Sequence, residues 1–239
     1  MSFENNLSIG NGIYTVPDVA RILRLPYHKV NTWLNEYWDG KLGKAFKGKY
    51  SWRVEGTRAV GFHTLIEFYV MMQLAEAGVK TNQVLRAHAD LSRTFNTIFP
   101  FAQKQVIENI STDGNKIYLS VDGSAITLDG TYQFNLGFIQ FFFKKLEFDR
   151  GLLAAKLWPA GKSKAVVCDP NHKFGQPVIE GTNIQTEAVY KMYLARESIP
   201  FIAGLYELPE KKVRDAIDFH KNAIFQSTIK NRVCLLGNG

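Results

Sequence analysis

The apolar positions near the start of the chain recur at helical spacing, three and four residues apart, which predicts a short helix with one buried face. This apolar stripe consists of Val16, Val19, Ala20 and Leu23. Thr15 supplies a capping hydroxyl, while Pro17 and Asp18 supply an early proline and an acid in the first turn. The helix is therefore expected to begin directly after Thr15.

A second short helix is expected after Leu25-Pro26 interrupts this stripe, with Val30, Trp33 and Leu34 on its inner face. Two short helices, a tight turn and a small alanine at their crossing are what a helix-turn-helix requires. The alternative is a plain helical hairpin with a polar outer face. Position 24, where such a turn often carries glycine, is Arg24. A left-handed backbone there costs a non-glycine residue about 1 kcal/mol, so a differently shaped turn is expected.

The outer face of the second helix carries hydrogen-bonding side chains of the kind that contact base edges and phosphates in a major groove. These candidate DNA-binding residues are Tyr27, His28, Lys29, Asn31, Thr32 and Asn35. A basic stretch follows, opposed only by Glu55 and interleaved with aromatic residues; it contains Lys41, Lys44, Lys47, Lys49, Arg53 and Arg58. We interpret it as a wing in which Lys44, Lys47, Lys49 and Arg53 contact phosphates. A solvated basic loop is the alternative.

Two longer helices are predicted next. The first spans Phe62 to Ala77 and ends at Gly78 as a C-cap; the second spans Thr81 to Phe95. His88 lies on the apolar stripe of the second helix, which predicts a packed core histidine rather than a ligand. Pro100 is expected to end the helical region.

Short alternating runs separated by Asp-Gly pairs predict a small β-meander in the middle of the chain. Its strands are Lys116–Val121, Ala125–Leu128 and Thr131–Phe134. An apolar stretch follows, which we interpret as a linking helix; it contains Phe138, Phe141, Phe142 and Phe143 and extends to Leu146 and Phe148. Since adjacent phenylalanines cannot share one helix face, this segment is either an intrachain core or a self-association surface.

Three short helices are predicted near the C-terminus, after a strand over Lys164–Cys168 and a tight bend between Gly175 and Ile184. Thr186 is expected to cap the first helix and Ser198 the second, while Pro209 opens the third. The inward residues are expected to be Val189, Met192 and Tyr193, then Ile202, Leu205 and Tyr206, then Val213, Ala216, Ile217 and His220. The three helices could form a second helix-turn-helix-like unit.

Composition favours a cytoplasmic protein with an anionic partner. The 239 residues carry a formal net charge of +7, and the pI is near 9.3. No apolar run reaches the roughly 20 residues that cross a bilayer, and no secretory signal is seen. The only two cysteines, Cys168 and Cys234, are too few for a disulfide framework.

The sequence contains no His-Glu-x-x-His motif, glycine-rich nucleotide fingerprint or Gly-x-Ser-x-Gly elbow, so we expect neither an enzyme nor a cofactor. Cys168 and His172 are four residues apart, but Pro170 lies between them and no second pair of ligands is nearby. No metal site is therefore predicted.

Two segments resemble known families. The stretch from Tyr14 to Leu34, with Tyr-Thr-Val-Pro-Asp-Val-Ala-Arg-Ile-Leu followed by Thr-Trp-Leu, resembles the MerR-type helix-turn-helix. The segment Gly175-Gln-Pro-Val-Ile-Glu-Gly-Thr-Asn-Ile184 resembles the signature of domain-of-unknown-function family 433. The downstream pieces Ala203–Leu208 and Val213–Ile217 match that family as well.

The second resemblance implies an antitoxin similar to the VapB type, paired with a small ribonuclease toxin of PIN-like fold and repressing the promoter that both share. Such toxins hold metal with carboxylates, so Lys230 and Arg232 of the basic tail are candidate toxin-binding residues, with a frayed terminus as the alternative. A homodimer would suit a two-fold symmetric operator in double-stranded DNA.

The sequence thus predicts an α+β protein in three parts. Residues 1–100 form a winged helix-turn-helix, residues 101–159 a β-meander with a linking helix, and residues 160–239 a trihelical domain with a basic tail. The predicted function is an antitoxin that neutralises its toxin and represses transcription. Two alternatives are a MerR-like regulator that responds to a small ligand and a pure protein-binding module.

Overall fold

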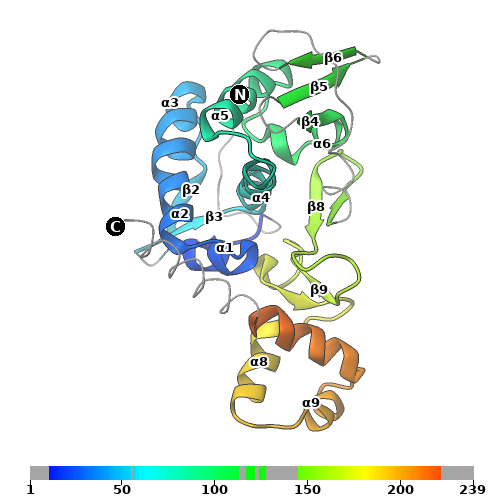
Figure 1. Ribbon diagram of the computed structural model, residues 1–239. Helices are drawn as coiled ribbons and strands as arrows, with labels where there is room; N and C mark the ends of the chain where they lie inside the picture. The colour runs from blue at the N-terminus through cyan, green and yellow to red at the C-terminus, as the bar shows by residue number, and fades with distance from the viewer. Residues whose placement is uncertain (1–10, 55, 113–116, 122–123, 128–144, 222–239) are drawn as a thin grey trace, which may run out of the picture.

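The computed structural model describes residues 11–54, 56–112, 117–121, 124–127 and 145–221, which form a mixed α+β protein with small antiparallel sheets (Figure 1). The first part of the chain contains β1 (Tyr14–Thr15), α1 (Val16–Leu23), α2 (Tyr27–Thr32), the π-helical segment η1 (Trp33–Leu42), α3 (Gly43–Phe46), β2 (Ser51–Val54), β3 (Thr57–Val60), α4 (Phe62–Glu76) and α5 (Thr81–Thr94). The strands form one antiparallel sheet in the order β1-β3-β2.

The start of α1 confirms the predicted cap. The Thr15 side chain accepts a hydrogen bond from the Asp18 backbone N–H, and the Asp18 carboxylate accepts one from the Thr15 N–H at 3.0 Å. Each of two otherwise unpaired amides at the helix start is thereby satisfied. The buried face of α1 contains the predicted stripe, with Val19 fully buried.

A second helix follows Leu25-Pro26 as predicted, but the helical segment is longer than expected. Helices α2, η1 and α3, of 6, 10 and 4 residues, follow one another without a break and form a single helical column. The widened π turns let the chain continue past Gly40, where a Cβ atom would lie 2.6 Å from the Asn35 carbonyl oxygen. The inner face is as predicted, because Val30, Trp33 and Leu34 are all buried.

Helix α4 lies at the centre of the main core and is buried on nearly every side, since eleven of its fifteen residues are buried. One of them is Glu67, whose carboxylate accepts a hydrogen bond from the Phe101 N–H at 2.9 Å and lies 2.8 Å from His88 Nε2. The predicted core position of His88 on α5 is therefore confirmed. Burial raises the pKa of Glu67, while His88 opposes that shift.

The middle of the chain contains more structure than predicted. Its elements are η2 (Pro100–Ala102), α6 (Lys104–Asn109), β4 (Ile110–Thr112), β5 (Ile117–Val121), β6 (Ser124–Thr127), β7 (Leu146–Phe148) and β8 (Ala154–Leu157). Pro100 thus begins a 3-10 turn instead of ending the helical region. Strands β4, β5 and β6 form an antiparallel sheet, whereas residues 131–134 and 138–143 lie outside the described residues.

Leu146 and Phe148 belong to a strand and not to the predicted linking helix, because β7 pairs with β8 in a hairpin. Leu146, Ala154 and Leu157 pack into the same core as Tyr14 and α4. This hairpin is thus part of the core built by the first hundred residues.

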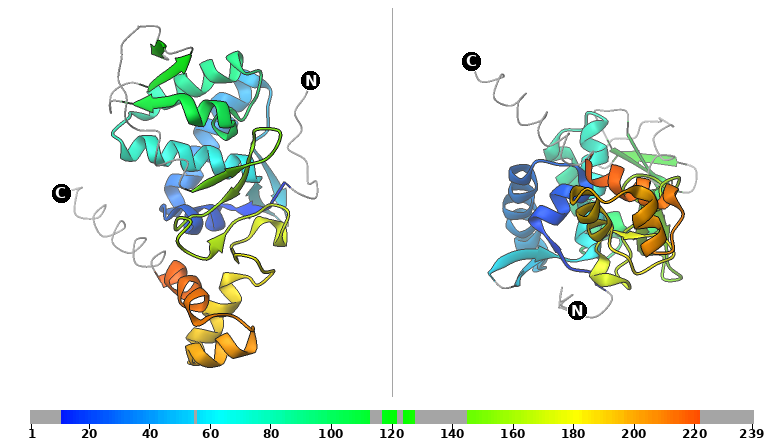
Figure 2. Two further views of the ribbon diagram at one scale, coloured as in Figure 1. Left: turned by 90° about the vertical axis from the view of Figure 1, so that its right-hand side faces the viewer. Right: turned by 90° about the horizontal axis from the view of Figure 1, so that it is seen from below.

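The last part of the described chain contains short strands followed by three helices, and the helices lie at one end of the molecule (Figures 1 and 2). It contains β9 (Val166–Val167), η3 (Lys173–Gly175), β10 (Val178–Ile179), α8 (Thr186–Leu194), α9 (Ile199–Leu205) and a helix over residues 210–221. The three helices enclose a separate core around Val189, Ile202, Val213, Ala216 and Ile217.

Two details of these helices differ from the prediction. Gln185, and not Thr186, occupies the N-cap of α8, because the Thr186 hydroxyl is buried and donates to the Pro177 carbonyl. Leu205, expected to face inward, is 57% exposed near the end of α9. The cap at Ser198 is confirmed, since its side chain accepts a hydrogen bond from the Phe201 N–H.

The buried His220 should make this end of the molecule sensitive to acid. Its ring stacks on Tyr190 at 4.9 Å, its Nε2 lies 3.0 Å from the Thr186 hydroxyl, and burial lowers its pKa to about 4. An unfolded histidine titrates near pH 6.5, so between about pH 6.5 and pH 4 the unfolded chain binds a proton that the folded chain does not. The stabilising contribution is thus complete above pH 6.5 and is lost as the pH falls towards 4.

We predict that the free energy of unfolding falls by roughly 2–3 kcal/mol between pH 7 and pH 4 through this group, and that His220→Phe removes that part of the loss. Urea unfolding of both proteins at several pH values measures the difference. Equal acid destabilisation of the wild type and His220→Phe would contradict the assignment.

Candidate functional site

The turn between α1 and α2 holds the two helices at a fixed angle. Arg24 adopts the left-handed conformation, with φ 55°, that its position was expected to avoid. The Leu25 N–H closes the turn by donating to the Ala20 carbonyl at 2.9 Å. The backbone hydrogen bonds that end α1 therefore outweigh the cost of about 1 kcal/mol for an arginine in this conformation.

The six candidate DNA-binding residues of the helical column all lie outside the buried core, although Lys29 borders the buried Trp33. Tyr27 is 55% exposed, and His28 and Asn35 are exposed as well, whereas Lys29, Asn31 and Thr32 are half-buried. The Lys29 ammonium lies 5.2 Å from the centre of the Trp33 ring, a cation–π contact that holds its stem against the helix. The structure thus leaves Tyr27, His28 and Asn35 exposed and the other three partly accessible along the first part of the column.

The four predicted phosphate contacts do not form one wing. Lys44 lies in α3, Lys47 ends that helix in a left-handed conformation, and Lys49 precedes β2, so only Arg53 lies on the β2–β3 hairpin. All four are exposed. Helices α2 and α3 mark opposite ends of the column in Figure 1. At 1.5 Å per residue, Lys44 lies roughly 20–25 Å along the axis from His28.

One carboxylate of the column, Asp39, fixes the root of the hairpin. It accepts hydrogen bonds from the Tyr50 N–H at 3.1 Å, from the Ser51 hydroxyl at 2.5 Å and from the Arg58 guanidinium at 2.7 Å. Glu55 is the only acid within the basic stretch, but the structure pairs Arg58 with Asp39, which precedes the stretch. No sequence pattern marked Asp39, because its three partners lie 11 to 19 residues away.

The loop at residues 173–176 is bonded to the first strand. The Ile13 N–H donates to the Phe174 carbonyl, the Gln176 side chain donates to the Ile13 carbonyl, and the Tyr14 hydroxyl donates to the Gly175 carbonyl at 2.8 Å. Lys173, Phe174 and Gly175 all have positive φ angles. A Cβ atom at Gly175 would lie 2.0 Å from the Tyr14 hydroxyl, so this contact requires glycine.

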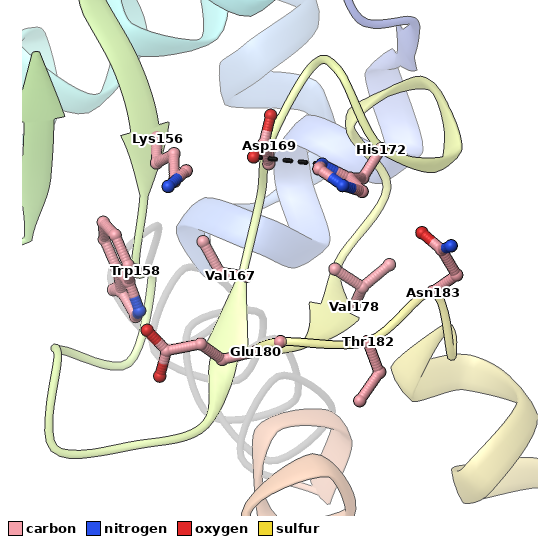
Figure 3. Close-up of a pocket in the computed structure, with 10 residues that line it drawn as sticks. Lys156, Trp158, Val167, Asp169, His172, Val178, Glu180, Thr182 and Asn183 are labelled. Atoms are coloured by element: carbon pink, nitrogen blue, oxygen red, sulfur yellow. Dashed lines mark ion pairs between the residues drawn. The ribbon is translucent and has the colours of Figure 1, made fainter. Parts of the chain in front are cut away.

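A polar pocket of about 300 Å³ lies beside this loop, between the end of β8 and strands β9 and β10 (Figure 3). The buried Asp169 accepts a hydrogen bond from the Asn171 N–H at 2.9 Å and lies 3.1 Å from His172 Nδ1. The opposite wall includes Glu180 and the buried Trp158, whose indole N–H has no partner among the described residues.

The Cys168 thiol and the His172 imidazole do not lie together as a pair of metal ligands. Cys168 is fully buried, which raises the pKa of its thiol, and His172 pairs with Asp169 instead. Within the described ranges, no three His, Cys, Asp or Glu side chains gather closely enough to hold a metal ion. The arrangement around Asp169 can orient an imidazole and bind a small polar group.

Comparisons with known proteins reach part of the chain. Residues 166–220, which include β9, β10, α8 and α9, match a family described as a protein of unknown function, DUF433. The described architecture is similar to the crystal structure of Rv2018 from Mycobacterium tuberculosis, with a TM-score of 0.63 over 85% of this chain and 96% of that chain. The sequences are 17% identical, so the likeness concerns the fold. A search of curated proteins found no significant match.

Two predicted site residues, Lys230 and Arg232, lie outside the described residues, as does the phenylalanine-rich segment at residues 138–143. Among the described helices, none is long and apolar enough to cross a membrane.

Asp39 provides a test of how the hairpin is held. We predict that Asp39→Asn lowers the free energy of unfolding by about 1–3 kcal/mol, because the charged acceptor for Arg58 is lost. Amide exchange at residues 51–54 and 57–60 should accelerate more than in α4. Asp90→Asn is the matched control, since Asp90 pairs with Arg93 at the surface and should contribute less than about 1 kcal/mol. Equal effects of the two substitutions would contradict the anchoring role.

Proposed function

We propose that this chain is a cytoplasmic DNA-binding regulator and the antitoxin of a toxin–antitoxin pair. In this proposal α1, α2 and the β2–β3 hairpin form a winged helix-turn-helix, and α2 reads base edges in the major groove of operator DNA. The observation that carries the proposal is the polar outer side of α2, where Tyr27 and His28 are exposed and Asn31 is half-buried, while Val30 is packed in the core. The +7 net charge adds non-specific attraction to the duplex.

The length of the helical column suggests how the polar residues of α2 and the lysines near α3 could contact the same duplex. The column places Lys44 roughly 20–25 Å from His28 along its axis, which is shorter than the roughly 34 Å helical repeat of B-DNA. With α2 in a groove, Lys44, Lys47 and Lys49 would then contact the phosphate backbone beside that groove, while Arg53 on the hairpin contacts nearer phosphates. A homodimer would place two such columns on a two-fold symmetric operator.

The antitoxin part of the proposal rests on the resemblance of the C-terminal segment to antitoxins that bind PIN-like ribonucleases. One structural observation favours a protein partner at this end, because three large apolar side chains of α8 and α9 are more than half exposed: Leu194, Phe201 and Leu205. A MerR-like regulator that responds to a small ligand is the second candidate.

Binding to the upstream DNA of its own gene, measured over a salt series against an unrelated duplex, tests the proposal. We predict that Lys44→Ala, Lys47→Ala and Lys49→Ala together weaken binding to both duplexes and reduce the salt slope by up to about 3. Asn31→Ala should instead lose about 1–3 kcal/mol of discrimination between the duplexes.

A matched triple variant separates a local effect from net charge. Lys80→Ala, Lys162→Ala and Lys191→Ala remove the same charge at exposed positions elsewhere and should leave the slope near that of the wild type. If both triple variants lower the slope equally, the column carries no specific phosphate contacts. Weak and equal binding of the wild type to both duplexes would overturn the DNA-binding proposal.

The basic tail is tested separately with the cognate ribonuclease. Lys230→Ala with Arg232→Ala should weaken inhibition of RNA cleavage by the purified toxin, if these cations pair with its acidic metal site. Unchanged inhibition by the double variant would remove the tail from the toxin interface. Absence of inhibition by the wild type would remove the antitoxin role altogether.

A further inference from the structure

A second pocket, of about 360 Å³, lies where α4 begins and α5 ends, beside the β7–β8 hairpin. Aromatic rings form much of its wall: Phe62 and His63 from the first turn of α4, Phe95 from the end of α5, and Phe99. Leu153 covers it from the hairpin side. We call this hollow the aromatic pocket.

The rings of the aromatic pocket are held in place by the core behind them. Phe99 lies 5.7 Å from Tyr50 in an edge-on arrangement and 5.6 Å from His63. Phe62 is buried, whereas Phe95, Phe99 and Leu153 are only partly buried and keep apolar surface towards the hollow. A preformed apolar hollow of this size is typical of small-molecule sites.

The polar groups of the aromatic pocket are few and uncharged. Asn96, Thr97 and Gln103 lie at its edge, and none of its lining residues is an aspartate, glutamate, lysine or arginine. Burial lowers the pKa of His63, so its imidazole is neutral at pH 7. A charged ligand would lose its hydration here without gaining an ionic partner, which disfavours it.

We propose that the aromatic pocket binds a small, neutral, planar aromatic molecule, which packs against Phe95 and Phe99 and hydrogen-bonds to an edge amide such as Gln103. Aromatic stacking and burial of the ligand supply the affinity, and the edge amides set its orientation. This binding does not depend on the proposed DNA-binding function.

The position of the aromatic pocket connects it with the sheet that carries the hairpin. Gly61 directly follows β3, and the Asn11 carbonyl, shortly before β1, accepts a hydrogen bond from the Phe62 N–H at 2.7 Å. Both Gly61 and Asn11 line the pocket. A bound molecule would therefore lie beside residues that precede β1 and follow β3 in the β1-β3-β2 sheet.

Calorimetric titration of the full chain with 2-naphthol and with 2-naphthoate tests the inference, because the two probes share a ring system and differ in charge at pH 7. We expect 2-naphthol to bind with a dissociation constant between about 10 µM and 1 mM, and 2-naphthoate to bind at least about tenfold more weakly. No binding of 2-naphthol, or equal binding of both probes, would overturn the proposal.

Variants locate the bound probe. Leu153→Trp fills the pocket and should abolish binding of 2-naphthol, whereas Leu152→Trp, at an exposed neighbour outside the lining, should bind like the wild type. Phe99→Leu keeps an apolar side chain but removes one ring, and it should weaken binding of 2-naphthol about tenfold. This variant tests the site if Leu153→Trp does not fold. Unchanged binding by a folded Leu153→Trp, or by Phe99→Leu, would place the probe elsewhere and refute the site.

Discussion

The fold depends on a buried tyrosine near the start of the described chain. The Tyr14 hydroxyl donates to the carbonyl of Gly175, 161 residues further along, at a point where only glycine leaves room. Burial raises the pKa of Tyr14 well above its usual value, so the hydroxyl stays protonated and remains a donor at physiological pH. Arg21 of α1 and Glu187 of α8 add an ion pair at 3.4 Å across the same junction. Helices α1 and α8, which lie far apart in the sequence, are thereby fixed to one another.

The helical column illustrates how one element can serve stability and recognition at once. Its inner side contributes Val30, Trp33 and Leu34 to the main core, and Asp39 fixes the hairpin, while its outer side carries the proposed DNA contacts. Residues with these two roles alternate along the same turns, so a substitution on the outer side need not disturb the core. The separation of function from stability follows from helical periodicity.

The two pockets differ in chemistry and in place. The polar pocket at Asp169 and His172 lies mainly in the segment that matches the family of unknown function. The aromatic pocket lies where α4 begins and α5 ends. The first offers charged and hydrogen-bonding groups, and the second offers uncharged apolar walls.

The sequence alone determined what depends on neighbouring residues. The Thr15 cap, the inner faces of α1 and α2, the left-handed Gly78 shortly after α4 and the core position of His88 follow from spacing and local hydrogen bonding. Tertiary structure decided the rest. The extent of the helical column depends on π turns around Gly40, the strand at Leu146–Phe148 depends on its partner β8, and the pairing of Arg58 depends on a carboxylate 19 residues away. Both pockets gather side chains from several elements, and such contacts leave no periodic mark in a sequence because folding alone brings them together.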